Sequence, residues 1–412
     1  MILSLAADYG RNEKGAKGPP RKMNRKLRLV VLGMMGRCPF GGQSWLYLNW
    51  LRGLHKLGHE VWYVEDDTVW PYDPERNSVT DDCSYAVRHI AGCMKRAGMP
   101  DTWEFRPAYR TGECHGISGS ELNDLYRSCD ALLNVVGATD LREEHLAARF
   151  RVYVECDPVI AELQLAKNDA HTVVALANHH EIVTYGENFG SPDCKVPLNG
   201  QRYGKTRQPV DLDFWPMTYE PDARFFTTIG NYRQDGNDVE YKGEIYHWSK
   251  HHEWEKFMDL PRRTSQPFEL AMKVEDPADR LRLEGHGWKV VPSFRMSLDV
   301  FGEYQTYFRR SRAEFTVAKD MNVRLRSGWF SERDACYLAS GKPVVAQDTG
   351  FGNILPTGEG LFSFTTTEEG LAAIDQINGD YRRHCLAARA IAEEYFEASK
   401  VAARLLADLG MA

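Results

Sequence analysis

The segment that first invites a chemical interpretation is "RSGWFSERDACYLASGKPVVAQDTG", residues 326–350. Ser331 and Asp334 have the spacing of a helix-capping pair, while Gly341 and Pro343 predict a helix end followed by a strand. Unpaired backbone N–H groups and the positive dipole end make a helix start suitable for anions. We therefore predict a diphosphate site around the helix start, formed by Arg326, Ser327, Gly328, Trp329, Phe330 and Ser331.

A second small-residue loop follows the predicted strand, with Asp348, Thr349 and Gly350. Open α/β sheets bind ligands at the carboxyl ends of their strands, so we expect the group attached to the diphosphate to lie there. An ordinary helix-to-strand loop is the alternative interpretation of both segments. In that case glycine and serine serve only the turn and the cap.

The surrounding sequence predicts the elements that must position these loops. Apolar runs that indicate buried strands alternate with helical segments, as in a doubly wound parallel sheet. The predicted strands lie at 27–33, 60–66, 131–136, 151–155, 172–176, 181–185, 224–232, 268–274, 288–293, 312–319 and 342–347. The alternation lapses near 197–224, a stretch with four prolines, which predicts two α/β halves joined there.

Four segments are predicted from this pattern. Residues 1–26 are expected to be a disordered tail, since they are polar and rich in glycine. Residues 27–218 form a first Rossmann-like domain and residues 219–378 a second one, facing it across a cleft. Residues 379–412 form helices, with one apolar stripe, that pack back on the first domain.

Composition narrows the class of protein. The 412 residues are 43% hydrophobic and carry a formal charge of −7, which does not favour a nucleic-acid partner. The nine cysteines form no C-x-x-C pair, and no apolar run reaches the length of a membrane span. We expect a cytoplasmic protein, monomeric or homodimeric, with no metal site, because the histidines lack metal-ligand spacing.

These features together resemble the two-domain glycosyltransferase architecture called GT-B. "GWFSERDACYLASGKPVVAQDTG" looks like its donor-site element, and "FGGQSWLYLNWLRGLHKLGHEVWYVED" resembles its opening unit. One departure stands out. Members related to sucrose and glycogen synthases carry a Glu-x7-Glu pair, whereas this sequence has Gly328 and Cys336 at those positions, with Glu332 and Asp334 as the nearest acids.

The resemblance implies sugar transfer from a nucleotide-diphosphate sugar to a soluble polar acceptor, without a metal or a further cofactor. Basic side chains and a helix dipole must then stabilise the leaving diphosphate. The candidate cations are Arg233, Lys242, Lys250, Lys319, Arg324 and Arg326. We expect two of the six to face the phosphates, and Arg233 and Arg326 rank first, because each adjoins a glycine or asparagine loop. For any single one of the six, a solvated surface charge is the more common role.

The acceptor needs a group that orients its nucleophile. Asp157, at the end of a predicted strand, is the first candidate, and His179 and Glu65 are further candidates. Gly41 and Gly42 in the first loop permit close approach of a ligand to the backbone. Two alternatives stay open: a nucleotide-sugar 2-epimerase, and a non-catalytic nucleotide-sugar binding protein, which the missing glutamates favour.

Overall fold

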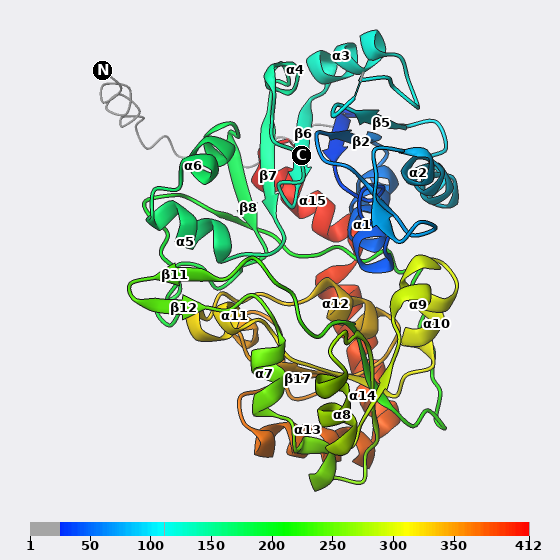
Figure 1. The fold of residues 1–412 in the computed structure, drawn as a ribbon, viewed down its shortest axis with the longest axis vertical. Coiled ribbons are helices and arrows are strands. Elements are labelled where there is room, and N and C mark those ends of the chain that lie inside the picture. The colour runs from blue at the N-terminus through cyan, green and yellow to red at the C-terminus, as the bar shows by residue number, and fades with distance from the viewer. Residues whose placement is uncertain (1–24, 111, 412) are drawn as a thin grey trace.

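The computed structural model describes residues 25–110 and 112–411, and Figure 1 shows two α/β halves, one above the other. All but the last two residues of the predicted tail, 1–26, lie outside this described part. The strands change from one sheet to the other between residues 205 and 226. The domain boundaries predicted at 218 and 378 stay predictions.

The first sheet contains seven parallel strands in the order β5-β2-β1-β6-β7-β8-β9. The strands are β1 (Arg28–Leu32), β2 (Glu60–Asp67), β5 (Trp103–Pro107), β6 (Ala131–Val135), β7 (Arg151–Glu155), β8 (Glu181–Thr184) and β9 (Gly204–Lys205). The helices between them are α1 (Gly41–Lys56), α2 (Ser84–Arg96), α3 (Gly119–Ser128), α4 (Glu143–Leu146), α5 (Ile160–Ala166) and α6 (Ala170–Ala177). A short hairpin, β3 (Tyr72–Asp73) and β4 (Ser78–Val79), follows β2.

The second sheet has six parallel strands in the order β14-β13-β10-β15-β16-β17. They are β10 (Phe226–Asn231), β13 (Phe268–Lys273), β14 (Trp288–Val291), β15 (Ala313–Thr316), β16 (Val344–Gln347) and β17 (Leu361–Phe364). Its helices are α7 (His251–Lys256), α8 (Pro277–Gly285), α9 (Phe294–Leu298), α10 (Glu303–Arg309), α11 (Asp320–Leu325), α12 (Glu332–Ala339) and α13 (Thr367–Gly379), with 3₁₀ turns at Leu260–Arg263 and Phe351–Asn353. An antiparallel hairpin, β11 (Val239–Tyr241) and β12 (Glu244–Tyr246), follows β10.

Both sheets follow the strand order of a doubly wound nucleotide-binding fold, in which the first strand lies beside the fourth. Alternate side chains of β1 enter two different cores, as the strand periodicity requires. Leu29 and Val31 pack with α1, whereas Val30 and Leu32 pack with α3. Both faces of the sheet are therefore covered, and the predicted doubly wound architecture is confirmed.

The last helix returns to the first half, as predicted, but the helix before it stays with the second half. The C-terminal elements are α14 (Tyr381–Ile391), which packs on α12, α13 and β17, a π-helical turn at Ala392–Phe396 and α15 (Ala398–Asp408). Figure 1 shows α15, in red, among the elements of the first half and beside α1. Gly53 of α1 lies directly against the Ala398 backbone, and an added methyl group would approach its carbonyl oxygen to 2.5 Å.

One strand prediction is wrong. Residues 172–176 lie inside helix α6, not in a strand. Their β-branched composition suggested a strand, but Asp169 caps a helix by accepting a bond from the Thr172 amide, and a crossover is needed between parallel strands β7 and β8. Strands β5, β9 and β17 and both hairpins were not predicted, because their runs are short or interrupted by polar residues.

Candidate functional site

Arg333 lies above the point where the second sheet reverses its strand order. Its Nη1 donates to the Ile229 carbonyl of β10 at 3.0 Å, and its Nη2 donates to Thr316 Oγ1 of β15 at 2.8 Å. β10 and β15 are the neighbouring strands at the switch point, where open α/β sheets bind ligands at their carboxyl ends. Helix α12 thus places the Arg333 guanidinium at the expected ligand position.

Lys319 follows β15 and joins the two halves of the molecule. Its ammonium group forms an ion pair with Asp157 Oδ2, from the loop after β7 of the first half, and lies over the Trp248 ring. Burial lowers the pKa of Lys319 to about 8, although the Asp157 carboxylate acts in the opposite direction. The other oxygen of that carboxylate, Oδ1, is buried and has no hydrogen-bond partner among the described residues.

Lys250 is the third cation of this group. Its ammonium nitrogen lies 5.3 Å from the centroid of the Trp329 ring, but no carboxylate of the described chain pairs with it. Burial, with Arg333 next in effect, lowers the pKa of Lys250 to about 7. The Asp334 and Glu314 charges act in the opposite direction, but neither carboxylate forms an ion pair with Lys250 in the described chain. A ligand that carries negative charge would favour the charged form of this lysine.

Besides Asp157, two carboxylates moderate the charge of this cationic cluster, defined as Lys250, Lys319 and Arg333. Glu314 Oε1 accepts a bond from Arg333 Nε at 2.5 Å, and Asp334 lies 3.2 Å from the same guanidinium. Burial, and then the Asp334 charge, raise the pKa of Glu314 to about 8. A Glu314 side chain that carries a proton at neutral pH leaves more of the cationic charge uncompensated.

The two loops predicted to hold the donor lie together beside this cluster. The Gly328 amide donates to the Thr349 carbonyl at 2.8 Å, and Thr349 Oγ1 donates to the Trp329 carbonyl at 2.6 Å. Ser331 caps α12 by accepting from the Arg333 amide, and its carbonyl accepts from Gln208. The start of α12 therefore adjoins the cationic cluster, but protein atoms fill much of the space beside its cap.

Both glycines of these loops have positive φ and touch Asn188 of the first half. An added methyl group would lie 2.4 Å from the Asn188 backbone at Gly328 and 2.7 Å from the Asn188 side chain at Gly350. Phe330 is also occupied, since it packs on Phe351 and Phe396. These predicted donor residues form the contact between the halves in this structure.

The two arginines that ranked first among the predicted cations are both in ion pairs. Arg326 lies 2.7 Å from Asp193 and 2.7 Å from Asp348, and Arg233 is paired with Asp279 through two bonds. Their guanidinium charges are therefore balanced by protein carboxylates. By this criterion the geometry favours Lys250, for which the described residues provide no ion pair, over both arginines as a ligand of an anion. Lys319 and Arg333 lie beside it, although each is itself paired with a carboxylate.

Of the two predicted glycines of the first loop, Gly41 is buried and Gly42 is exposed. An added methyl group on Gly41 would approach the Tyr304 ring of α10 to 2.5 Å, and one on Gly42 would lie 3.6 Å from the Tyr304 hydroxyl. Glycine at position 41 thus allows the second half to pack against the first loop. Its small size serves the contact between the halves.

Glu65 and His179, two predicted acceptor-binding groups, are engaged elsewhere. Glu65 is buried, and its carboxylate accepts bonds from the backbone amides of Gly36 and Arg37. His179 precedes β8, and its ring nitrogens contact the Ala175 carbonyl at 2.8 Å and the Asn134 amide at 3.2 Å. Burial lowers the pKa of His179 to about 4. Asp157 is the predicted acceptor group that lies beside the cationic cluster.

The sequence reasoning missed Arg333 and Glu314. Glu314 lies inside a run of apolar residues, and a charged residue in a buried strand is a usable signal because it requires a partner. Arg333 lies inside the predicted capping segment, where the helix start drew attention away from its side chain. Lys319 was among the candidate cations, but its pairing with Asp157 joins residues 162 positions apart in the chain.

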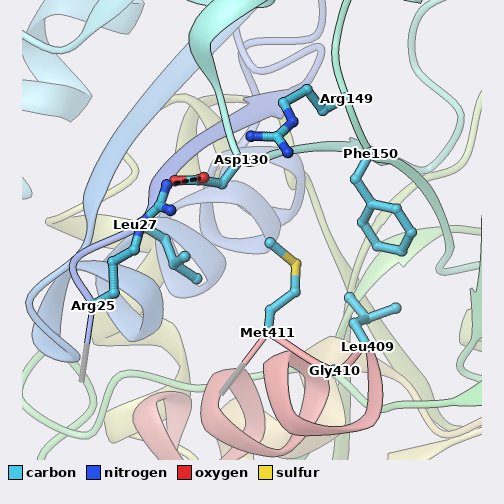
Figure 2. Close-up of a pocket in the computed structure, with 8 residues that line it drawn as sticks. All are labelled: Arg25, Leu27, Asp130, Arg149, Phe150, Leu409, Gly410 and Met411. Atoms are coloured by element: carbon cyan, nitrogen blue, oxygen red, sulfur yellow. Dashed lines mark hydrogen bonds and ion pairs between the residues drawn. The ribbon is translucent and has the colours of Figure 1, made fainter. Parts of the chain in front are cut away.

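The described residues form a small cavity next to this site and a larger groove far from it. The small cavity, at the carboxyl ends of β15 and β16, is bordered by Trp329, Phe330 and Asp334. The groove, of about 320 Å³, lies where strands β1, β6 and β7 begin (Figure 2). Figure 2 shows Arg25 paired with Asp130 and the side chain of Met411 on the opposite side. None of the predicted site residues borders this groove.

Within the described residues, no helix combines the length and apolar character that crossing a membrane requires.

Solved structures that resemble this chain share one architecture. An α-glucosyltransferase solved with UDP and a 13-mer DNA is 10% identical, with a TM-score of 0.59, over 94% of this chain and all of that chain. The chain has the GT-B fold. HepE of Anabaena, solved with UDP and glucose, is 12% identical with a TM-score of 0.55, over 94% of this chain and all of its own.

A third solved structure is AviGT4, a glycosyltransferase involved in avilamycin A biosynthesis. It is 13% identical, with a TM-score of 0.51, over 93% of this chain and 96% of its own. No protein-family model matches the sequence, and no curated protein has a significantly similar sequence. These similarities establish the fold, and the chemistry must be argued from the residues of the site.

The acidic residue Glu332 lies closer to the position of the absent second glutamate than its place in the sequence suggested. Glu332 and Cys336 are four residues apart on α12 and therefore share one face of the helix. The Glu332 carboxylate accepts a bond from Asn49 of α1 at 3.3 Å, and burial raises its pKa well above its usual range.

Proposed function

We propose that this protein is a glycosyltransferase that moves a sugar from a nucleotide-diphosphate sugar to a soluble polar acceptor. The observation that carries the proposal is the ammonium group of Lys250, which has no carboxylate partner among the described residues although Lys319 and Arg333 lie nearby. A diphosphate supplies the missing negative charge. The names of two structural neighbours, which mention bound UDP, support a ligand of this kind.

The cationic cluster suits the bond-breaking step. When the sugar leaves its nucleotide, negative charge grows on the diphosphate, and preorganised cations stabilise that charge most in the transition state. Lys250, Lys319 and Arg333, with the adjacent start of α12, supply this stabilisation from the protein. We therefore propose that sugar transfer itself needs no metal ion.

Asp157 is our candidate for the group that orients the acceptor. One of its oxygens is held by Lys319, while Oδ1 is buried without a partner in the described chain. A hydroxyl group of the acceptor would satisfy this oxygen by donating a hydrogen bond to it. The ion pair with Lys319 would link the position of the acceptor to the diphosphate site.

A non-catalytic nucleotide-sugar binding protein is the second candidate, and one observation favours it. Neither position of the Glu-x7-Glu pair carries an acid: Gly328 is packed against Asn188, and Cys336 is buried. Binding through the cationic cluster would still be expected. Both candidate functions therefore use the same donor site, but only the glycosyltransferase would transfer the sugar.

A panel of nucleotide-diphosphate sugars separates these functions. The protein is incubated with each donor, with and without sugar acceptors, and free nucleoside diphosphate and sugar products are measured. Acceptor-dependent release of diphosphate is expected. Binding without release would indicate the binding protein, and a sugar isomer formed without an acceptor would indicate a 2-epimerase. If none of the nucleotides binds, the proposal is wrong.

A matched pair of variants tests whether donor binding depends on the cationic cluster. Lys250→Met removes the unpaired cation, whereas Lys273→Met removes an exposed lysine of β13 that is paired with Glu275. Only the first change is expected to weaken donor binding. Equal loss in both variants, or in neither, would contradict the assigned site.

A further inference from the structure

A second group of polar side chains lies where the β11–β12 hairpin joins the rest of the second half. Val239 and Tyr246 are the last paired residues of this hairpin, so Asp238 and His247 face each other just beyond it. Asp238 Oδ2 lies 2.8 Å from His247 Nδ1, and Asp238 Oδ1 accepts from the Trp248 amide. The hairpin thus holds a carboxylate and an imidazole together.

His252, in the first turn of α7, completes the group. The centroid of its ring lies 3.9 Å from the centroid of the His247 ring, with 25° between the ring planes. One ligand atom from each of Asp238, His247 and His252 lies within 4.8 Å of the others. A tetrahedral zinc ion needs ligand atoms about 3.3 Å apart, given Zn–N bonds of about 2.0–2.1 Å, so the two stacked imidazoles must rotate to direct a nitrogen atom each toward one ion.

The charges around this group differ from those around the other cluster of possible metal ligands, Asp66, Glu144 and His145. Asp66 is fully buried and is paired with two arginines, Arg106 and Arg142, so protein cations already balance its negative charge. No lysine or arginine of the described residues is paired with Asp238. The side chains of Asp238 and His247 are 45% and 31% exposed, which leaves them accessible to an ion from solution.

We propose that Asp238, His247 and His252 bind a divalent first-row transition-metal ion, for which Zn²⁺ is the best fit. Two imidazoles and one carboxylate are the ligand types that Zn²⁺ accepts, and a water molecule can take the fourth position. Mg²⁺ and Ca²⁺ prefer oxygen ligands and are expected to bind poorly.

Such an ion would fasten the β11–β12 hairpin to the start of α7. The connection between His247 and His252 contains Trp248, whose ring covers Lys319, and Lys250 of the cationic cluster. The ion would therefore fix the position of the segment that carries two residues of the candidate donor site. It would act on the backbone of this segment and not on the transferred sugar, so the metal proposal does not depend on the proposed function.

Direct metal binding by the full chain tests this inference. The protein is treated with a chelator, desalted and titrated with Zn²⁺ alone, in competition with a chromophoric chelator. One tight site per chain is expected. The double variant His247→Asn/His252→Asn is expected to lower the affinity by at least about tenfold. The control is His171→Asn, because His171 is an exposed histidine that also lies beside an aspartate, Asp140.

Co²⁺ provides a second measurement, since its visible absorption reports the ligand geometry. An absorption band typical of tetrahedral cobalt in the unchanged protein, lost in the separate variant Asp238→Asn, supports the site. Circular dichroism of each metal-free variant verifies that it is folded. The proposal is overturned if the unchanged protein binds no Zn²⁺, or if the double variant and the His171→Asn control bind it equally well.

Discussion

Two groups of cationic side chains lie at the contact between the halves, and their partners differ. Arg326 is held by Asp193 of the first half and by Asp348 of the second, so its charge is balanced on both sides. Lys250, in contrast, has a tryptophan ring and two other cations nearby and no carboxylate partner in the described chain. The charge of Arg326 is therefore balanced without a ligand, whereas the charge of Lys250 is not.

This difference in ion pairing distinguishes a structural contact from a candidate binding site. Ion pairs that satisfy both partners can hold two domains together, although exposed pairs contribute little. A partly buried cation without a counter-ion destabilises the protein, and such strain is often retained for function. Proximity to a helix start and a glycine loop is common to both groups and does not separate them.

The largest expected effect tests Asp157, which links the cationic cluster to the first half. The Asp157→Asn side chain has the same shape, but its amide is a much weaker base than the carboxylate for the proton of the acceptor hydroxyl. We therefore expect kcat for sugar transfer to fall about 100-fold. Binding of the nucleoside diphosphate should be unchanged or tighter, because Lys319 loses its counter-ion. Steady-state kinetics and calorimetry measure the two effects. An unchanged kcat would remove Asp157 from the mechanism.

Lys250→Met tests the role of the unpaired cation directly. The dissociation constant for a nucleoside diphosphate is expected to rise about 10- to 100-fold, as for the loss of a hydrogen bond to a charged group. The melting temperature should stay the same or rise, because an unpaired cation is removed. Calorimetry and thermal unfolding test both points, with Lys273→Met as control. A clear loss of stability would show that Lys250 has a structural partner after all.

The pH dependence of binding provides a smaller effect. Burial lowers the pKa of Lys319 to about 8, so its positive charge is lost as the pH rises above that value. Affinity for the diphosphate is therefore expected to fall at least about tenfold between pH 7 and pH 9. Lys250, whose pKa is also lowered, titrates in the same direction.

The variant Lys319→Met is expected to make this decline shallower. Calorimetric titrations at several pH values measure it, with a buffer of constant ionic strength because surface charges respond to salt. An affinity that stays constant from pH 7 to pH 9, or that rises, would contradict the assignment of Lys319 to the diphosphate.

Arg326→Ala is expected to have the smallest effect on the ligand. The change leaves Asp193 and Asp348 without their shared cation, so the free energy of unfolding should fall by about 1 kcal/mol. Diphosphate affinity should fall less than in Lys250→Met. Chemical denaturation and calorimetry on the two variants provide the comparison. An equal or larger loss of affinity in Arg326→Ala would reverse the roles assigned to the two groups.

The sequence predicted the architecture well, because hydrophobic periodicity and helix caps are local signals. The apolar runs at 27–33 and 342–347 are strands, and Gly58 and Gly341 follow helices with φ of +87° and +69°. The same local signals failed at 172–176, where β-branched residues occupy a helix that connects two parallel strands. There the topology of the sheet overrode the preference of the residues.

The candidate site was predicted only in part. The sequence identified the start of α12 and the two loops near it, since capping residues and glycines are recognisable in a single segment. It ranked Arg233 and Arg326 above Lys250 because each adjoins a glycine or asparagine loop. Their carboxylate partners, Asp279 and Asp193, are 46 and 133 positions away in the chain, where a local pattern does not reveal them. Whether a charge is balanced depends on such distant partners.

The amino-acid sequence by itself determined the alternation of strands and helices, the two-part organisation and the segment that begins α12, because each depends on neighbouring residues. The tertiary structure alone decided which cations are balanced, that Asp157 lies beside Lys319, and that a hairpin brings Asp238 to two histidines. The physical reason is that charge, burial and ligand geometry act through space, between residues that the fold brings together from distant parts of the chain.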